Sequence, residues 1–171
     1  GYVAQKAHMF KGSIRSNICF GKPDASDEEM VHAATVAQAS DFISKREHGY
    51  LDEIAEDGTN ISGGQKQRLS IARVILKKPS LYIYDDSFSA LDFKTDATLR
   101  KALKPEVKDA IFFVVAQRIS TIMDSDMIIV LDEGQIIGMG THTQLLKDCR
   151  VYQEIAHSQL TQKELDDYER N

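Results

Sequence analysis

The sequence predicts an α/β fold in which a mainly parallel sheet follows a largely helical segment. Three short apolar stretches, at 81–84, 111–115 and 127–131, have the length and composition of strands. Helical patterns separate them, and this alternation is typical of parallel strands that are joined through helices. Residues 24–78 instead show mostly helical patterns. We therefore expect a division between a helical part and a sheet part near residue 80.

The composition narrows the class of protein. The chain has 171 residues, of which 27% are charged and 42% hydrophobic, so we expect one globular unit and not disorder. A net charge of −5 gives no overall electrostatic reason to bind nucleic acid. The longest apolar run, 110–116, is far shorter than the ~20 residues that cross a bilayer, and no charged-then-apolar leader opens the chain. We expect no direct membrane insertion, a cytosolic location, and isolated thiols at Cys19 and Cys149.

The first elements can be justified from local patterns. Residues 1–4 have the composition of a strand. Ser26 and Glu29 have the spacing of a capping box, which marks the beginning of a helix. The periodic apolar positions that follow are Val31, Ala34 and Val36. A second, shorter helix is expected over residues 41–45.

A third helix is expected after the polar stretch 53–60. Ser62 is placed to cap its first turn, and Pro79 marks its end because proline cannot continue a helix. Three apolar positions of this helix fall on one face, namely Leu69, Ala72 and Leu76. This face is therefore expected to be buried.

The last part of the chain combines a turn signal with helical patterns. Glu133 and Gly134 stand between the apolar stretch 127–131 and residues 135–138, so the last two strands are expected to form a hairpin and not a crossover. One or two helices are expected from Thr143 onward. The charged residues 163–171 are expected to form a solvated terminal helix.

The segment with the clearest chemical meaning is Ile-Ser-Gly-Gly-Gln-Lys-Gln-Arg, at residues 61–68. Glycines allow the backbone to approach a ligand closely, and the unpaired amides at a helix start favour a phosphate. A serine-capped helix start would explain Ser62, but it would explain neither Gly63 nor Gly64. The sequence therefore favours an anion site at the start of the third helix.

This segment also resembles a family motif. Residues 61–65 are similar to the signature motif of ATP-binding cassette (ABC) transporter nucleotide-binding domains, whose usual form is Leu-Ser-Gly-Gly-Gln. Other family motifs are matched in family order: the Q-loop glutamine by Gln5, the Walker B strand by 81–85, the D-loop by 89–92, the H-loop region by 117–121 and the segment after it by 138–145. The resemblance spans nearly the whole chain, and the motifs are similar to those of exporters.

The resemblance implies a fold and an organisation along the chain. The expected fold is α/β, with a partial P-loop NTPase (RecA-like) core whose sheet is mainly parallel, plus the ABC helical subdomain. The expected boundaries are 1–12 for the strand end and Q-loop, 13–78 for the helical subdomain with the signature motif, 79–149 for the RecA-like core, and 150–171 for the C-terminal helices.

The resemblance also implies ATP and Mg²⁺ as cofactors. Asp85 ends an apolar strand, so its carboxylate is expected at the edge of the sheet where open α/β folds bind ligands. Together with Gln5 it would hold Mg²⁺ through oxygen atoms, which this ion prefers. The remaining residues that the resemblance implies in nucleotide binding are Ser62, Gly63, Gly64, Gln65, Ser89 and Asp92.

The first departure from the family is an absence. No Gly-x-x-x-x-Gly-Lys-Ser/Thr occurs in the sequence, so the phosphate-binding Walker A loop is expected upstream of Gly1, together with central strands of the sheet. The 171 residues alone are therefore expected to be inactive. Unpaired sheet edges are expected to favour self-association.

Two further departures concern hydrolysis. Asp86 occupies the position of the glutamate that acts on the attacking water, and aspartate is one methylene shorter. Gln117 occupies the position of a histidine; glutamine can donate a hydrogen bond but cannot carry the charge of an imidazolium. In the family, each ATP lies between the Walker motifs of one domain and the signature of a second, head-to-tail domain. Asp86 and Gln117 are thus expected to belong to a degenerate catalytic site, as in heterodimeric exporters.

The resemblance implies the ATP-binding subunit of an ABC exporter, which couples ATP binding and hydrolysis to transport. Its implied partners are a second nucleotide-binding domain and transmembrane domains, at the cytoplasmic side of the cell membrane. The alternatives are a non-transport ABC ATPase, such as a translation factor or a chromosome-organising ATPase, and a regulatory nucleotide-binding module. The acidic, compact chain and the exporter-like motifs at 89–92 and 117–121 favour the exporter.

Overall fold

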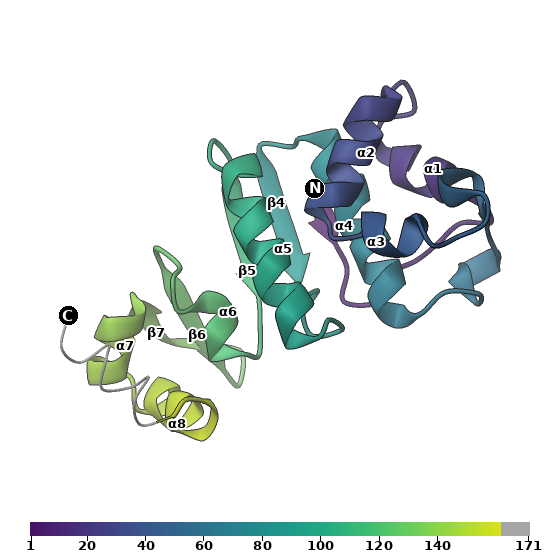
Figure 1. The fold of residues 1–171 in the computed structure, drawn as a ribbon. Coiled ribbons are helices and arrows are strands. Elements are labelled where there is room, and N and C mark those ends of the chain that lie inside the picture. Colours follow the sequence, from purple (N-terminus) through teal and green to yellow (C-terminus); the bar gives the residue numbers. More distant parts are fainter. Residues whose placement is uncertain (162–171) are drawn as a thin grey trace. The chain divides into compact units, whose positions relative to one another are not determined.

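The computed structural model describes residues 1–161, which belong to two compact units (Figure 1). The first unit is Gly1–Val115 and the second begins at Ala116. The charged end predicted at 163–171 lies outside the described residues. Within residues 1–161, none of the helices combines the length and the hydrophobicity that a membrane span requires.

The first unit contains a parallel sheet of three strands. Its order is β1 (Tyr2–Val3), β4 (Leu81–Asp85) and β5 (Ile111–Val115), and both neighbouring pairs are parallel. The predicted α/β fold with a parallel sheet is therefore confirmed. Because Asp85 is the last residue of β4, its carboxylate lies at the carboxyl end of the sheet, as the sequence predicts.

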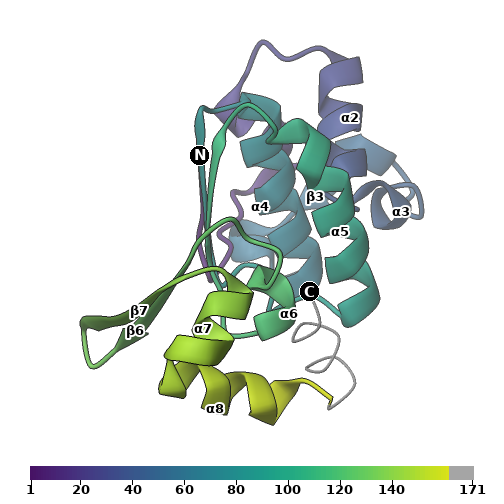
Figure 2. The same ribbon diagram turned by 90° about the vertical axis from the view of Figure 1, so that its left-hand side faces the viewer.

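Two helices, α4 (Gly63–Lys77) and α5 (Phe93–Glu106), cover the same face of this sheet (Figure 2). The covered face contributes Val3, Tyr82 and Tyr84, which are all buried. The opposite face exposes apolar side chains of β1 and β5, namely Tyr2, Ile111, Phe113 and Val115. Among residues 1–115, no helix covers that second face.

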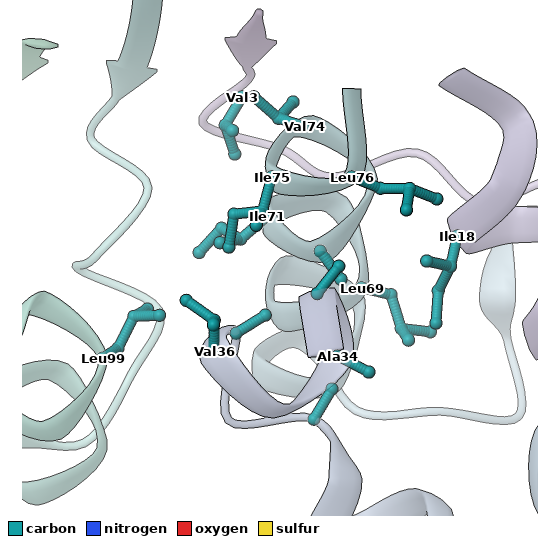
Figure 3. Packing of buried hydrophobic residues seen from close by; sticks show 14 of the residues in the cluster. Val3, Ile18, Ala34, Val36, Leu69, Ile71, Val74, Ile75, Leu76 and Leu99 are labelled. Carbon is teal, nitrogen blue, oxygen red and sulfur yellow. The ribbon is translucent and has the colours of Figure 1, made fainter. Parts of the chain in front are cut away.

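The helical part of the first unit is built around α4. Three shorter helices accompany it, α1 (Ile14–Ile18), α2 (Asp27–Val36) and α3 (Ser40–Ile43). Figure 3 shows side chains of α1 and α2 beside α4, among them Ile18, Ala34 and Val36. Leu99 of α5 belongs to the same buried cluster. Each fully buried Val, Leu or Ile side chain stabilises the fold by roughly 1.5–3 kcal/mol, so this cluster is a main source of stability.

Most of the predicted helical features are confirmed. Ser26 and Glu29 form a capping box at the start of α2, and Leu69, Ala72 and Leu76 are buried on α4. The second predicted helix is α3, which begins one residue earlier and ends two residues earlier than expected. Of the three periodic apolar positions, Ala34 and Val36 are buried, whereas Val31 is 42% exposed. The buried positions of α2 are Met30, Ala33, Ala34 and Val36.

The sequence patterns did not reveal a small antiparallel pair inside the helical part. It consists of β2 (Gly12–Ser13) and β3 (Glu53–Ile54), and Gly12 pairs with Ile54. Two-residue strands are too short to show a period of two. Three short 3₁₀ helices, Cys19–Gly21, Gly49–Leu51 and Glu56–Gly58, complete this region.

Between residues 116 and 161, the second unit contains a hairpin and three helices. The strands β6 (Ile128–Asp132) and β7 (Gln135–Gly140) are antiparallel, which confirms the predicted hairpin. Glu133 and Gly134 both have positive φ, as the tight turn between them requires. The helices are α6 (Ile119–Ile122), α7 (His142–Asp148) and α8 (Arg150–Gln159), and their core contacts include Ile128, Leu145 and Tyr152.

Candidate functional site

Two consecutive carboxylates lie at the carboxyl end of β4. The hydroxyl of Tyr2 donates a hydrogen bond to Oδ2 of Asp85 at 2.8 Å, and Nε2 of Gln5 donates to Oδ2 of Asp86 at 3.3 Å. Because β1 pairs with β4, the end of β1 brings Tyr2 and Gln5 to these carboxylates. The structure thus brings together three of the predicted site residues, Gln5, Asp85 and Asp86.

Tyr2 is a member of this cluster that the sequence motifs did not reveal. The hydrogen bond to Asp85 raises the pKa of the Tyr2 phenol, and desolvation and the negative charge of Asp85 act in the same direction. The phenol therefore stays protonated at neutral pH and remains a donor. No spacing rule would have found this contact, because it depends on the register between segments more than 80 residues apart.

The backbone after β4 is held in an uncommon conformation. Asp86 has φ of 44°, in the left-handed region, and its amide donates to the carbonyl of Val115 at 2.9 Å. The hydroxyl of Ser89 donates to the carbonyl of Asp86 at 2.7 Å, and that of Ser87 donates to the carbonyl of Val3 at 3.0 Å. These bonds fix the direction in which the largely buried Asp86 side chain leaves the sheet.

The predicted signature segment forms the start of α4. Ser62 is the N-cap, its hydroxyl accepts from the amide of Gln65 at 3.2 Å, and Oε1 of Gln65 accepts from the amide of Ser62 at 3.0 Å. An accepting hydroxyl keeps its own hydrogen for another acceptor. The amides of Gly63 and Gly64 lie in the first turn, where a helix offers no internal acceptor. The exposed helix start therefore presents several donors to an anion.

The two glycines of this segment differ in their surroundings. A Cβ atom added at Gly64 would lie 3.3 Å from the carbonyl oxygen of Ala90, so close packing within the first unit accounts for this glycine. A Cβ atom added at Gly63 would meet nothing within 4 Å. Packing among the described residues therefore does not account for a glycine at position 63.

The predicted D-loop residue Asp92 is the N-cap of α5. Its carboxylate accepts hydrogen bonds from the amide and the hydroxyl of Thr95, at 3.0 and 2.7 Å. These bonds lower the pKa of Asp92, the backbone bond contributing most. The carboxylate thus has a structural partner within its own helix.

Gln117 is the second residue of the second unit, which begins directly after β5 in the sequence. Its carbonyl oxygen accepts a hydrogen bond from Nε2 of Gln159 at 2.8 Å, and its side chain is exposed. Across residues 1–161, no group of three or more His, Cys, Asp and Glu side chains could hold a metal ion. Cys19 and Cys149 are free and buried, which confirms the prediction of isolated thiols.

A second feature that the motifs did not reveal is a pair of exposed aromatic rings. Phe10 and Phe20 are stacked with ring centroids 4.4 Å apart, and they are 46% and 60% exposed. The guanidinium of Arg73 lies 5.4 and 5.7 Å from the two ring centroids. Its Nε donates to the carbonyl of Asn17 at 2.9 Å, which anchors the cation below the rings.

Comparisons with known proteins agree with these motifs. The family model described as ABC transporter matches residues 1–89. An uncharacterized ABC transporter ATP-binding protein of Mycobacterium bovis is 43% identical over 162 residues, which cover 93% of this chain and 28% of that protein. The Bacillus subtilis protein named "Putative multidrug export ATP-binding/permease protein YgaD" is 47% identical over 146 residues, which cover 85% of this chain and 25% of that protein.

A solved structure has the same fold. It is described as the structure of a bacterial Atm1-family ABC exporter with ATP bound, and it matches with a TM-score of 0.89 and 37% identity. The match covers 92% of this chain and 28% of that chain. The chain thus spans little more than a quarter of the length of these relatives. The motifs, the fold and the family model lead to one conclusion: the chain belongs to the ABC transporter family.

Proposed function

We propose that the chain is part of the ATP-binding subunit of an ABC exporter. This subunit couples ATP binding and hydrolysis to transport, at the cytoplasmic side of a cell membrane. The proposal rests mainly on the exposed start of α4, where Ser62, Gly63, Gly64 and Gln65 present donors to an anion. Export is supported by the names of the similar proteins, a putative multidrug export protein and an Atm1-family ABC exporter. The cargo would be selected by transmembrane domains that act with this chain.

In the proposed dimer, the start of α4 faces a nucleotide that a second nucleotide-binding domain holds. The amides of the first turn and the Ser62 hydroxyl would bind its terminal phosphate, and the positive end of the helix dipole favours that charge. The open space beside Gly63 supports this role, because a phosphate or a partner backbone needs room there. Gly64 would keep the helix start close to the loop at Ala90.

The chain's own carboxylates would hold Mg²⁺ with a second nucleotide. Asp85 and Gln5 provide a carboxylate and a carboxamide oxygen at the carboxyl end of the sheet, and hard oxygen donors suit this ion. Oδ1 of Asp85 accepts no hydrogen bond from residues 1–161, so it is available to a ligand. The chemistry that bound Mg²⁺ supplies is charge neutralisation on the phosphates. Asp85, Gln5, Ser89 and Asp92 would then line the nucleotide together.

We further propose that this second site is degenerate. Asp86 would orient the attacking water, but its side chain is one methylene shorter than the glutamate of active relatives, and Gln5 already donates to it. A well-placed general base contributes about 10²–10⁴ in rate, and a base held too far away loses much of this factor. Gln117 would donate a hydrogen bond without positive charge. A heterodimer with one competent site explains an intact signature beside these two changes.

The isolated chain is proposed to be inactive, because its sequence contains no Walker A motif.

The proposed organisation of the chain has four parts. They are the strand end and Q-loop at 1–12, the helical subdomain with the signature at 13–78, the RecA-like core at 79–149 and the C-terminal helices at 150–171. Exposed aromatic rings at a protein surface often mark an interface. The stacked Phe10 and Phe20 would therefore contact the transmembrane partner.

The substitution Gly63→Asp tests the proposal in the assembled transporter. The new side chain enters open space, and an acidic residue in the first turn favours the helix, so folding should be unaffected. A carboxylate facing a triphosphate costs several kcal/mol, so ATP turnover should fall by about 100-fold or more. His48→Asp adds the same charge at another exposed position and should leave turnover unchanged. Normal turnover of Gly63→Asp would contradict the proposal.

A further inference from the structure

Tyr2 contacts Asp85 but has no part in the proposed function as stated above. Tyr2 pairs with Ile83 in the parallel register of β1 and β4, and its hydroxyl donates to Oδ2 of Asp85 at 2.8 Å. Side chains alternate between the two faces of a strand, so Tyr2, Ile83 and Asp85 share one face of the sheet. The Tyr2 phenol and the Asp85 carboxylate therefore lie on the same face of the sheet, where they form their hydrogen bond.

Burial among residues 1–161 does not explain a tyrosine at this position. The Tyr2 side chain is 58% exposed, whereas the next residue, Val3, is completely buried on the opposite face. Among residues 1–161, the Tyr2 hydroxyl has no hydrogen-bond partner besides Asp85. Other residues would also fit an exposed strand. Tyrosine differs from them because its hydroxyl donates a hydrogen bond to the Asp85 carboxylate.

We infer that Tyr2 is a positioning residue for Asp85, which engages one carboxylate oxygen and leaves the other for the metal ion. This inference rests on the proposed function, in which Asp85 is a ligand of Mg²⁺. A neutral donor keeps the negative charge on the carboxylate while it restricts rotation of the side chain. Gln5 does not do this for Asp85, because its amide donates to Asp86.

The expected loss of metal affinity can be estimated from metal sites in other proteins. Partners that hydrogen-bond to a metal ligand contribute about 10–100-fold to metal affinity, and an exposed bond belongs at the lower end. Removal of the Tyr2 hydroxyl should therefore weaken metal binding about tenfold. Because the phenyl ring remains in the Tyr2→Phe variant, the strand pairing and the melting temperature should not change.

The test measures Mn²⁺ binding by electron paramagnetic resonance in the assembled transporter with ATP present. The variant Asp85→Asn should remove the Mn²⁺ ion that Asp85 binds. The signal lost in this variant therefore identifies that ion. Tyr2→Phe should weaken the binding of that ion about tenfold. Tyr50→Phe, which removes a distant tyrosine hydroxyl from the first unit, should leave the binding unchanged.

The outcomes separate this inference from the proposed function. If the wild type binds Mn²⁺ through Asp85 and Tyr2→Phe binds it equally well or more tightly, the positioning role is wrong and the proposed function stands. If the wild type shows no binding that depends on Asp85, both are overturned. A folding defect in Tyr2→Phe, seen as a lower melting temperature, would also contradict the inference, because it would assign the hydroxyl a structural role.

Discussion

Asp86 combines a short acidic side chain with a left-handed backbone, at φ of 44°. Asn and Asp tolerate this region better than most residues. An aspartate therefore suits the turn after β4, where three hydrogen bonds fix the backbone on either side of it. The same choice of residue shortens the reach of the carboxylate. The backbone conformation at position 86 thus favours aspartate, whereas the proposed role of its carboxylate in hydrolysis favours the longer glutamate.

Restoring the family residues should accelerate hydrolysis at this site. In an assembled transporter whose other nucleotide site is inactivated, Asp86→Glu combined with Gln117→His should raise single-turnover hydrolysis at least about tenfold, since a positioned base contributes about 10²–10⁴ and aspartate retains part of this factor. Asp86→Glu should also lower stability by less than about 1 kcal/mol, because glutamate is less suited to positive φ. Rapid-quench measurement of ATP cleavage gives the rate, and thermal melting gives the stability.

Two findings would contradict the unequal-site proposal. One is a partner domain that also has Asp and Gln at these positions. The other is a homodimer of this chain with high ATPase activity. The double variant Asp86→Gln and Gln117→His serves as the matched control, since it provides the histidine without a base and should not gain turnover.

At the scale of elements, α7 and α8 are joined through a buried histidine. Nδ1 of His142 lies 2.6 Å from the hydroxyl of Tyr152, and both side chains are buried. Burial lowers the pKa of His142 below its usual 6.5, and the nearby Asp124 opposes this shift only in part. The folded second unit therefore favours the neutral imidazole, whereas the unfolded chain binds a proton more readily.

The stability of the second unit should consequently depend on pH. Because the unfolded state binds more protons, stability is fully present above pH 6.5 and falls as the pH drops below this value, by at most about 1.4 kcal/mol per pH unit. Thermal melting of the full chain between about pH 5 and pH 8, where histidine titrates, measures this dependence. His142→Gln should flatten the curve, and His157→Gln, at an exposed position, should not. An unchanged slope in His142→Gln would refute the assignment.

At the scale of the whole molecule, the sheet of the first unit presents an apolar face and open strand edges. Ile111, Phe113 and Val115 alternate along β5 toward that face and are 67%, 50% and 46% exposed. Because the sheet order is β1, β4, β5, the outer edges of β1 and β5 have no neighbouring strand among the described residues. Such edges and apolar faces promote association between chains.

The isolated 171-residue chain should therefore self-associate. Sedimentation velocity should show oligomers, and Phe113→Glu should shift the distribution toward the monomer because a charge on this face opposes its burial. Ala97→Glu places the same charge on the exposed side of α5 and should have no effect. A monodisperse wild-type monomer that unfolds cooperatively would contradict the expectation.

The sequence by itself determined the features that depend on residues close together in the chain. Ser26 with Glu29 and Ser62 with Gln65 are three positions apart, so each helix start is specified within a single turn. The turn at Glu133 and Gly134 is equally local, and the alternation of strands and helices was sufficient to predict a parallel sheet. The motif order was sufficient to predict the family.

Only the tertiary structure decided which distant residues meet. The pairing of β1 with β4 places Tyr2 beside Asp85 and Gln5 beside Asp86, and the approach of α4 to the loop at Ala90 accounts for Gly64. The antiparallel pair of β2 and β3 arises in the same way. The physical reason is that such contacts depend on how complete elements pack against one another, and a local window of sequence contains no information about that packing.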